Sequence, residues 1–272
     1  MNWFAEVHGA LCEPDPARKV ERTLALADAG GLDRNGPPAE PAGPVPGRPP
    51  RPLLVAAASV PQRGFGSPAA RAALVHAIAH IEFNAINLAL DACWRFRAMP
   101  AEFYSDWLSV AKDEARHFQM LVERLAELGH AYGDFDAHSG LWDAAQKTRD
   151  DVLERMALVP RVLEARGLDV TPVLITKLRQ AGDAGTVALL EVILAEEVRH
   201  VAIGSRWFHH LCAQRGLEPE STFRDLLARH GMTHRQAFNV PARLAAGFTQ
   251  SELARLSGTR VNPESSARKT SQ

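Results

Sequence analysis

The chain has 272 residues, enough to bury a sizeable core, with a net charge of −1 and a pI near 6.8. Such a balance gives no clear nucleic-acid surface and no attraction to an anionic membrane. No run reaches the ~18 uninterrupted apolar residues of a membrane span, and residues 1–11 lack the basic start of a secretory signal. We therefore expect a soluble, cytoplasmic protein of bacterial type.

The three cysteines, Cys12, Cys93 and Cys212, are widely spaced and form no Cys-x-x-Cys pair. A thiolate zinc site or a disulfide framework is therefore not expected. We expect reduced thiols that pack as small apolar groups.

Residues 1–66 are expected to form an N-terminal arm. Asp15-Pro16 is typical of a helix start, and Gly30-Gly31 of a stop, so residues 1–30 should contain a short helical segment. Prolines dominate the next stretch, as in Pro-Gly-Arg-Pro-Pro-Arg-Pro at 46–52. Because proline lacks the backbone donor, this stretch should be an extended strap. It is either a linker or a segment that wraps the core.

Four long helices are predicted within residues 67–215. Ser67-Pro68 begins the first, which should run about thirty residues towards Pro100. The short connection at Pro100 makes the second helix its antiparallel neighbour. Pro160 should bend the third helix, Gly167 should end it, and a short helix should follow. The expected ranges of the last four helices in this region are 101–128, 141–166, 172–181 and 186–214.

The end of the chain should be helical and then irregular. Residues 216–257 form a helical extension, with one helix near 221–230, and residues 258–272 are expected to be disordered. No alternating strand pattern occurs anywhere. The predicted fold class is all-α, a bundle of four long helices with additions at both ends.

A Glu-x-x-His pattern occurs twice inside the long helices, as Glu114…His117 and Glu197…His200. Residues three apart share a helix face, so each pair can direct a carboxylate and an imidazole to one point. A third copy, Glu127…His130, contains Gly129. It is typical of a helix end rather than of a site.

Single glutamates on the other two long helices complete the pattern. Glu82 lies in an otherwise apolar stretch of the first helix, where an unpartnered carboxylate would be costly to bury. On the third helix, Glu164 and Glu154 are the alternatives. Glu164 lies 33 residues before Glu197, and Glu82 lies 32 before Glu114, so the spacing favours Glu164. Glu154 is nearer the middle of its helix.

These spacings indicate a duplicated helical hairpin that supplies four carboxylates and two imidazoles. This is the ligand set of carboxylate-bridged di-iron and di-manganese bundles. We expect two metal ions, iron first, with manganese or a mixed Mn/Fe pair as the alternative. The predicted metal ligands are Glu82, Glu114, His117, Glu164, Glu197 and His200. No further catalytic residue and no organic cofactor is assigned.

The polar neighbours of these residues have plainer expected roles. His76 and His80 share a helix face with each other and are expected to pack or to hydrogen-bond ligands rather than bind metal. Arg116 and Arg199 precede the ligand histidines, and Asp113 and Glu196 precede the ligand glutamates. Exposure or support of neighbouring groups is expected for all four.

At the level of whole motifs, the sequence resembles the ferritin-like superfamily, and within it the uncharacterised bacterial family numbered 455 among the domains of unknown function. Nearly the whole chain takes part. The motifs are His-Ile-Glu at 80–82, Glu-Ala-Arg-His-Phe at 114–118, Val-Pro-Arg-Val-Leu-Glu-Ala-Arg-Gly-Leu-Asp at 159–169, Ala-Glu-Glu-Val-Arg-His at 195–200 and Phe-Asn-Val-Pro-Ala-Arg-Leu-Ala-Ala-Gly-Phe at 238–248. Glu-Ala-Arg at 164–166 is also similar to a motif of tRNA-hydroxylating di-iron monooxygenases.

This resemblance implies a ferritin-like four-helix bundle with Glu164 as the third-helix ligand. The leading functional hypothesis is an oxygen-activating di-iron oxidoreductase acting on an unknown organic substrate, either a small molecule or a modified nucleoside. The alternative is a metal-binding, storage or structural protein without turnover. A tyrosyl-radical generator is disfavoured, because Tyr104 and Tyr132 lie at helix ends. No membrane partner is expected, and the apolar long helices permit a homodimer.

Overall fold

The computed structural model describes residues 2–28, 44–60, 64–232 and 237–257, and every regular element in these ranges is helical. The only β-type pairing among them is an isolated bridge between Leu54 and Ala137. The all-α prediction is therefore confirmed.

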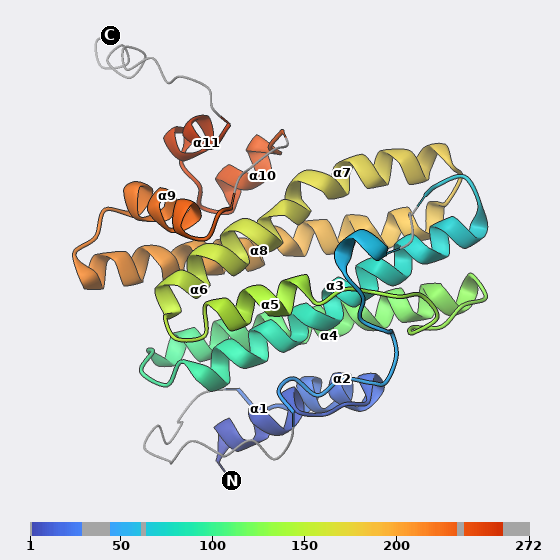
Figure 1. Ribbon diagram of the computed structural model, residues 1–272, viewed down its shortest axis with the longest axis horizontal. Helices are drawn as coiled ribbons and strands as arrows, with labels where there is room; N and C mark the ends of the chain where they lie inside the picture. Colours follow the sequence, from blue (N-terminus) through green and yellow to red (C-terminus); the bar gives the residue numbers. More distant parts are fainter. Residues whose placement is uncertain (1, 29–43, 61–63, 233–236, 258–272) are drawn as a thin grey trace.

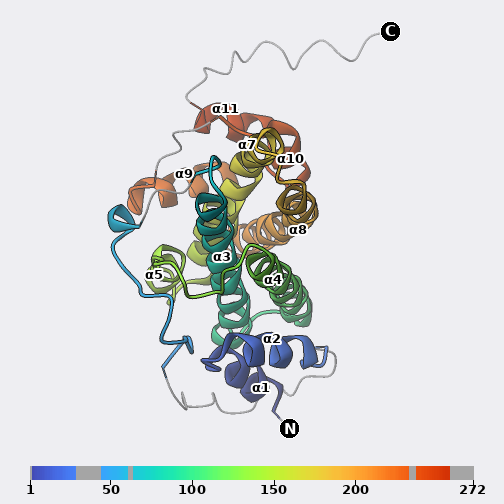
Figure 2. The same cartoon turned by 90° about the vertical axis from the view of Figure 1, so that its right-hand side faces the viewer.

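Four long helical stretches lie side by side in the middle of the molecule (Figure 1). They are α3 (Pro68–Arg95), α4 (Ala101–Glu127), a composite stretch that ends in α7 (Ala165–Gln180), and α8 (Ala184–Arg215). Seen along their axes in Figure 2, α3 and α4 lie next to each other, and α7 and α8 form the neighbouring pair. The predicted long helices thus exist, and the third has a different construction from the one expected.

Helix α3 begins as predicted and forms a core element. The Ser67 side chain accepts a hydrogen bond from the Ala70 amide, and Pro68 occupies the first turn, where its missing donor costs nothing. By length and composition alone α3 could cross a membrane, with a mean hydropathy of 1.3 over its best 18-residue window. However, 89% of that window is buried by the rest of the protein, as in the core helix of a soluble domain.

The prediction of one helix over residues 141–166 is wrong. The stretch is divided into α5 (Gly140–Lys147), α6 (Val152–Leu158) and η2 (Val159–Glu164), which is a π-helix. Arg155 explains the break after α5, because its guanidinium donates to the Ala145 carbonyl and to Thr148 Oγ1 at the end of that helix. A side chain thus satisfies the Ala145 carbonyl, a backbone acceptor that a continuing helix would have used.

The prediction that Gly167 ends the third helix is wrong. Helix α7 continues through Gly167 and through Pro172. Proline cannot donate to the carbonyl four residues earlier, which is that of Leu168. Asn239 Nδ2 fills this role from a distant part of the chain, at 3.1 Å from the Leu168 oxygen. A long-range hydrogen bond therefore permits a helix that the local sequence argues against.

The N-terminal arm contains two helices, α1 (Trp3–Leu11) and α2 (Pro16–Ala25), where one short segment was expected. Asp15 begins α2 as predicted and accepts a hydrogen bond from the Arg18 amide. Figure 2 shows both helices packed below α3 and α4. Cys12 follows α1 and is partly buried, whereas Cys93 and Cys212 are buried, and all three are free thiols.

The strap, which we define as residues 44–60, is held against its neighbours by backbone hydrogen bonds and includes the short helix η1 (Ala57–Ser59). Gly47 donates to the Leu11 carbonyl at 2.9 Å, and Val55 donates to the Ala137 carbonyl at 2.8 Å. A Cβ atom on Gly47 would lie 2.1 Å from the Cys12 carbonyl oxygen, so only glycine allows this approach. Of the two alternatives for this segment, the described part favours packing over a free linker.

The C-terminal extension lies on the side of the molecule opposite the arm (Figures 1 and 2). It consists of α9 (Pro219–Arg229), α10 (Val240–Ala245) and α11 (Gln250–Leu256). Thr249 and Glu252 form a capping box at the start of α11. The tail that was expected to be disordered, 258–272, lies outside the described residues, as do 29–43 of the arm.

Candidate metal centre

The predicted ligand residues come from each of the four long helical stretches. Glu82 lies on α3, Glu114 and His117 on α4, Glu164 at the end of η2, and Glu197 and His200 on α8. The side chains of Glu82, Glu114, His117 and His200 are almost completely shielded from solvent, and that of Glu197 is 13% exposed. Residues far apart in sequence thus meet in the interior.

Four of these side chains form one compact group. One ligand atom from each of Glu82, Glu114, His117 and Glu197 can be chosen so that all four lie within 4.8 Å of one another. The His117 Nδ1 atom lies 3.3 Å from Glu82 Oε2 and 3.5 Å from Glu114 Oε2. These donors are sufficient to hold a metal ion.

The remaining two predicted ligands adjoin this group. His200 Nδ1 lies 2.9 Å from Glu114 Oε1 and 3.2 Å from Glu197 Oε1. Glu164 is close enough to Glu197 and Glu114 for their charges to raise its pKa. Glu114 is thus contacted by both histidines and occupies the middle of the arrangement.

Burial and mutual repulsion give the carboxyl groups unusual acidities. Loss of solvent, followed by the charge of Glu114, raises the pKa of Glu82 to about 8. Burial also raises the pKa of Glu164 well above its ordinary value, with the charges of Glu197 and Glu114 as further causes. Acidic groups arranged in this way favour any bound species that brings positive charge.

Both Glu114 oxygens and Glu164 Oε2 are shielded from solvent and accept no hydrogen bond of good geometry in the described chain. Buried polar atoms are normally paired, so unpaired carboxylate oxygens at one point call for a missing partner. A cation satisfies this requirement, because carboxylate oxygens are common ligands of metal ions. The donor set therefore fits a metal, and four carboxylates balance the charge of two divalent ions.

The far sides of the two histidines are bound by acids from the opposite helix. His117 Nε2 of α4 lies 2.7 Å from Glu196 Oε2 of α8, and His200 Nε2 of α8 lies 3.1 Å from Asp113 Oδ2 of α4. Each contact places a proton on Nε2, and Nδ1 of each ring faces the acidic cluster. Asp113 and Glu196 are thus supports for the histidines, a role that was considered for them beside plain exposure.

Two arginines bind these supporting acids. Arg116 donates to Asp113 at 2.9 Å and to Glu196 at 2.5 Å, and Arg199 donates to Asp113. Burial opposes ionisation of Asp113, but the hydrogen bond and charge of His200 and the charge of Arg199 lower its pKa to about 2. Hydrogen bonds from His117 and Arg116 likewise lower the pKa of Glu196, against the effect of burial. Both acids therefore remain ionised at neutral pH.

The π-helix η2 places Glu164 in the cluster. A buried arginine of the same segment binds it to the C-terminal extension. Arg161 donates to Glu252 of α11 at 2.5 Å, and its guanidinium lies 4.5–4.7 Å from the ring centres of Phe208, Phe223 and Phe248. Arg161 is completely buried. π-Helical turns often occur at functional sites, and here the C-terminal extension holds one in place.

A second buried pair joins the sequence motifs at 159–169 and 238–248. Arg243 of α10 donates to Asp169 of α7 at 2.6 Å, and Asn239 donates through its backbone to the same carboxylate at 2.9 Å. These contacts give Arg243, Asn239 and Asp169 a structural role within the two motifs. The pairing of these two motifs was not predicted from the sequence, although the charged residues of opposite sign within them could have suggested it.

Three other predicted residues lie apart from the acidic cluster. Glu154 binds Arg229 at 2.6 Å and His230 at 2.9 Å, so it fixes α9 to α6. His76 Nε2 accepts from the Gly133 amide at 2.9 Å, and His80 Nδ1 contacts the Tyr132 hydroxyl at 2.8 Å. The packing role expected for both histidines agrees with these contacts.

The third Glu-x-x-His pattern is not part of a site. Glu127 pairs with Arg124 at the exposed end of α4, and His130 lies 3.4 Å from Asp134. Gly129 between them has a φ of +79°, as at a helix C-terminus. The helix end expected at Gly129 is therefore confirmed.

Tyr132 is nearer the cluster than its place beyond a helix end indicated. Its ring centre lies 5.7 Å from that of Phe83 and 4.9 Å from that of Phe118, and these residues follow Glu82 and His117. Tyr104, by contrast, donates to the Phe96 carbonyl at 2.9 Å. Neither position could be read from local sequence, because the loop after α4 folds back over α3.

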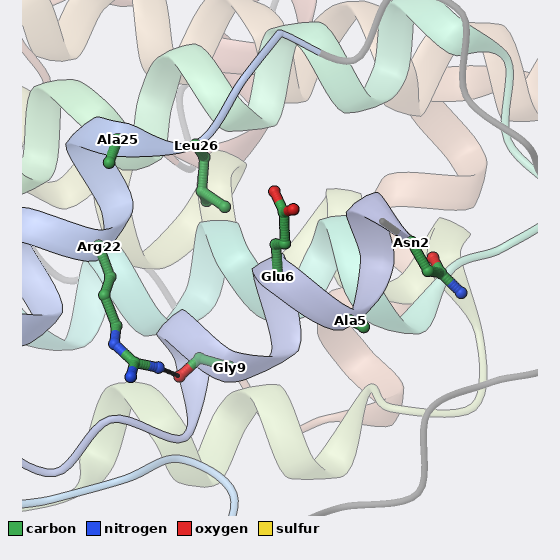
Figure 3. Close-up of a pocket in the computed structure, with 7 residues that line it drawn as sticks. All are labelled: Asn2, Ala5, Glu6, Gly9, Arg22, Ala25 and Leu26. Carbon is green, nitrogen blue, oxygen red and sulfur yellow. Dashed lines mark hydrogen bonds between the residues drawn. The ribbon is translucent and has the colours of Figure 1, made fainter.

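A cavity of about 420 Å³ lies in the N-terminal arm and is separate from the acidic cluster. Figure 3 shows that its lining comes from α1, α2 and their ends, with Arg22 donating to the Gly9 carbonyl at 3.3 Å. It holds one carboxylate, Glu6, and no second acidic or imidazole group. This cavity therefore lacks the donors of a metal site.

Comparison with known proteins supports the resemblance to the family numbered 455 among the domains of unknown function, and it names no activity. A family model described as "Protein of unknown function (DUF455)" matches residues 12–254. An "Uncharacterized protein" of Haemophilus influenzae is 51% identical over 213 residues, which are 75% of this chain and 74% of that protein. No solved structure matches.

Proposed function

The chain belongs to the family described as a protein of unknown function (DUF455), and we propose that it is a ferritin-like di-metal protein that activates oxygen to oxidise an organic substrate. Iron is the proposed metal, with manganese or a mixed Mn/Fe pair as the alternative. The proposed ligands are Glu82, Glu114, His117, Glu164, Glu197 and His200.

One observation carries this proposal: the buried Glu114 carboxylate has no good hydrogen bond in the described chain, although both ligand histidines approach it. A carboxylate between two sets of donors would be able to bind a cation on either side. The duplicated pattern supports the same view, because each hairpin contributes one glutamate and one Glu-x-x-His. A single ion held by the compact group of four side chains would not use the donors of Glu164 and His200.

A metal pair bound here would supply the electrons and the open coordination positions for reduction of oxygen. The protein's own groups prepare the place for it. Asp113 and Glu196 accept from Nε2 of each histidine, so that Nδ1, once it has lost its proton, would be the atom that binds a metal. Phe83 and Phe118 form an apolar wall next to Glu82 and His117, and this wall excludes water.

Oxygen uptake under reducing conditions separates this function from metal storage. Purified full-length protein would be loaded with ferrous iron without oxygen, washed, and mixed with oxygen and an excess of reductant. An oxygen-activating protein continues to consume oxygen while its iron stays near two ions per chain. A storage protein instead accumulates more iron per chain, and a structural protein shows neither behaviour.

The matched variants are Glu164→Ala, at a proposed ligand, and Glu154→Ala, at the other third-helix glutamate. Oxygen uptake should fall strongly in the first and remain in the second, because Glu154 binds Arg229 and His230 instead of facing the cluster. Equal uptake in the Glu164→Ala variant and the wild type would contradict the proposed ligand set.

A further inference from the structure

A second polar cavity lies beneath the strap, on the face of α3 that points away from the metal centre. It has a volume of about 20 Å³, is partly open, and is lined by Arg48, Pro49, Pro52, Leu54, His80, Phe83, Asn84 and Tyr132. His80 and Asn84 are each two positions from Glu82, or about 200° around the helix. The cavity and the acidic cluster are thus separated by α3.

The hydrogen bonds in this cavity fix which groups can donate into it. Asn84 Nδ2 donates to the His80 main-chain carbonyl at 2.8 Å, which assigns the amide orientation, because a carbonyl can only accept. The same amide nitrogen lies 3.1 Å from His80 Nε2. His80 Nε2 must therefore accept, and in the neutral ring the proton lies on Nδ1.

That tautomer determines the role of Tyr132. His80 Nδ1 lies 2.8 Å from the Tyr132 oxygen and donates to it, so the hydroxyl hydrogen has no acceptor in this pair. The Tyr132 hydroxyl is consequently a donor available to the cavity.

Arg48 supplies positive charge at the same place. In the described parts of the chain its half-buried guanidinium makes no hydrogen bond and no ion pair within 4.0 Å. The charges of Asp143 and Lys19 reach it only over longer distances. A partly desolvated guanidinium without an acceptor is costly, and it commonly binds carboxylate or phosphate groups.

We propose that this cavity binds the carboxylate group of a small-molecule ligand, with Arg48 and the Tyr132 hydroxyl as its donors. The size favours one carboxylate oxygen between the two donors, with the rest of the ligand directed to the open side. A tetrahedral phosphate needs more room than about 20 Å³ provides. The site is independent of the proposed metal chemistry, since no proposed ligand lines it.

The strap gives this site a structural context. Gly47, next to Arg48, donates to the Leu11 carbonyl, and the same carbonyl accepts from buried Lys19 at 2.7 Å. The proposed donor is therefore held by the arm on one side, and Tyr132 is held by the loop after α4. Preorganised donors of this kind bind anions with little loss of conformational freedom.

Calorimetric titration of the full-length protein with sodium acetate tests the proposal, with sodium phosphate as the competing probe and sodium chloride holding the ionic strength constant. We expect one acetate per chain in this site and weaker binding of phosphate. Arg48→Gln should weaken acetate binding about tenfold or more, because a charged hydrogen-bond donor is lost. Tyr132→Phe should weaken it severalfold with little change in shape.

Arg224→Gln is the control, because Arg224 is an exposed arginine on α9 and lies outside the cavity lining. Its acetate affinity should equal that of the wild type. Acetate that bound at the metal centre instead would be insensitive to Arg48→Gln and to Tyr132→Phe. Unchanged affinity in both variants, absence of saturable acetate binding, or tighter binding of phosphate than of acetate would each overturn the proposal.

Discussion

His117 Nε2 of α4 lies 2.7 Å from Glu196 Oε2 of α8, the residue directly before the proposed ligand Glu197. His200 has the equivalent contact with Asp113, which directly precedes Glu114. Each Glu-x-x-His helix therefore positions the histidine of the other. This reciprocity couples the two halves of the proposed centre. A displacement of one helix would therefore also move the ligand histidine of the other.

Removal of the support at His117 should weaken metal binding. In Glu196→Ala the Nε2 proton loses its acceptor, and the imidazole loses its fixed orientation. Comparable losses of groups that hydrogen-bond ligand histidines reduce metal affinity roughly 10–100-fold. The affinity can be measured by competition with a chelator. Glu191→Ala on the same helix is the control, because Glu191 pairs only with exposed Arg179 in the described contacts, and its affinity should remain unchanged.

The contact between Gly204 of α8 and Pro160 of η2 should be sensitive to one added methyl group. A Cβ atom on Gly204 would lie 2.3 Å from Pro160 Cβ and Cγ. Gly204→Ala should therefore lower the free energy of unfolding by roughly 1–3 kcal/mol, as for other overpacked sites. Denaturant unfolding measures this change.

Gly167→Ala provides the matched comparison for that contact. A Cβ atom there would meet no atom within 4 Å, and Gly167 lies inside α7. Replacement should leave stability equal or raise it by roughly 0.4–1 kcal/mol, because alanine restricts the unfolded chain. A Gly204→Ala protein as stable as Gly167→Ala would show that the π-helix does not depend on this close approach.

Buried Lys19 should make stability depend on pH. Its Nζ donates to the Leu11 carbonyl and to Asn87 Oδ1, and burial lowers its pKa from 10.5 to about 7. Between these pH values the unfolded chain binds more protons than the folded chain. The free energy of unfolding should therefore rise as pH increases from about 7 towards 10.5.

Comparison with Lys19→Met isolates this contribution from other titrating groups. The variant fills similar volume and carries no titrating nitrogen, so it should lack the part of the rise due to Lys19. The measurement is denaturant unfolding of both proteins at several pH values. Parallel pH profiles would contradict a strongly lowered pKa for Lys19 in the folded protein.

Local sequence predicted the elements whose boundaries depend on local chemistry. Ser67-Pro68 begins α3, Gly129 follows the end of α4, and Asp15 begins α2, because caps and prolines act within one turn. The grouping of Glu82 with the two Glu-x-x-His helices followed from spacing along a duplicated hairpin. Those features require no knowledge of distant contacts.

The third helix could not be predicted in the same way. Its break after α5 depends on Arg155, and its continuation through Pro172 depends on Asn239, which is 71 residues away from its partner Leu168. The π-helical segment that carries Glu164 packs closely on Gly204 through Pro160 and is bound to Glu252 through Arg161. Tertiary contacts thus override the local signals of proline and glycine in this part of the chain.

The metal content of the purified protein tests the central claim most directly. Elemental analysis after anaerobic iron loading and removal of free metal should find about two ions per chain in the wild type, and a strong loss in a Glu114→Ala/Glu197→Ala variant that remains folded by circular dichroism. Absence of bound metal in the wild type, or two ions per chain in the double variant, would contradict the proposed centre.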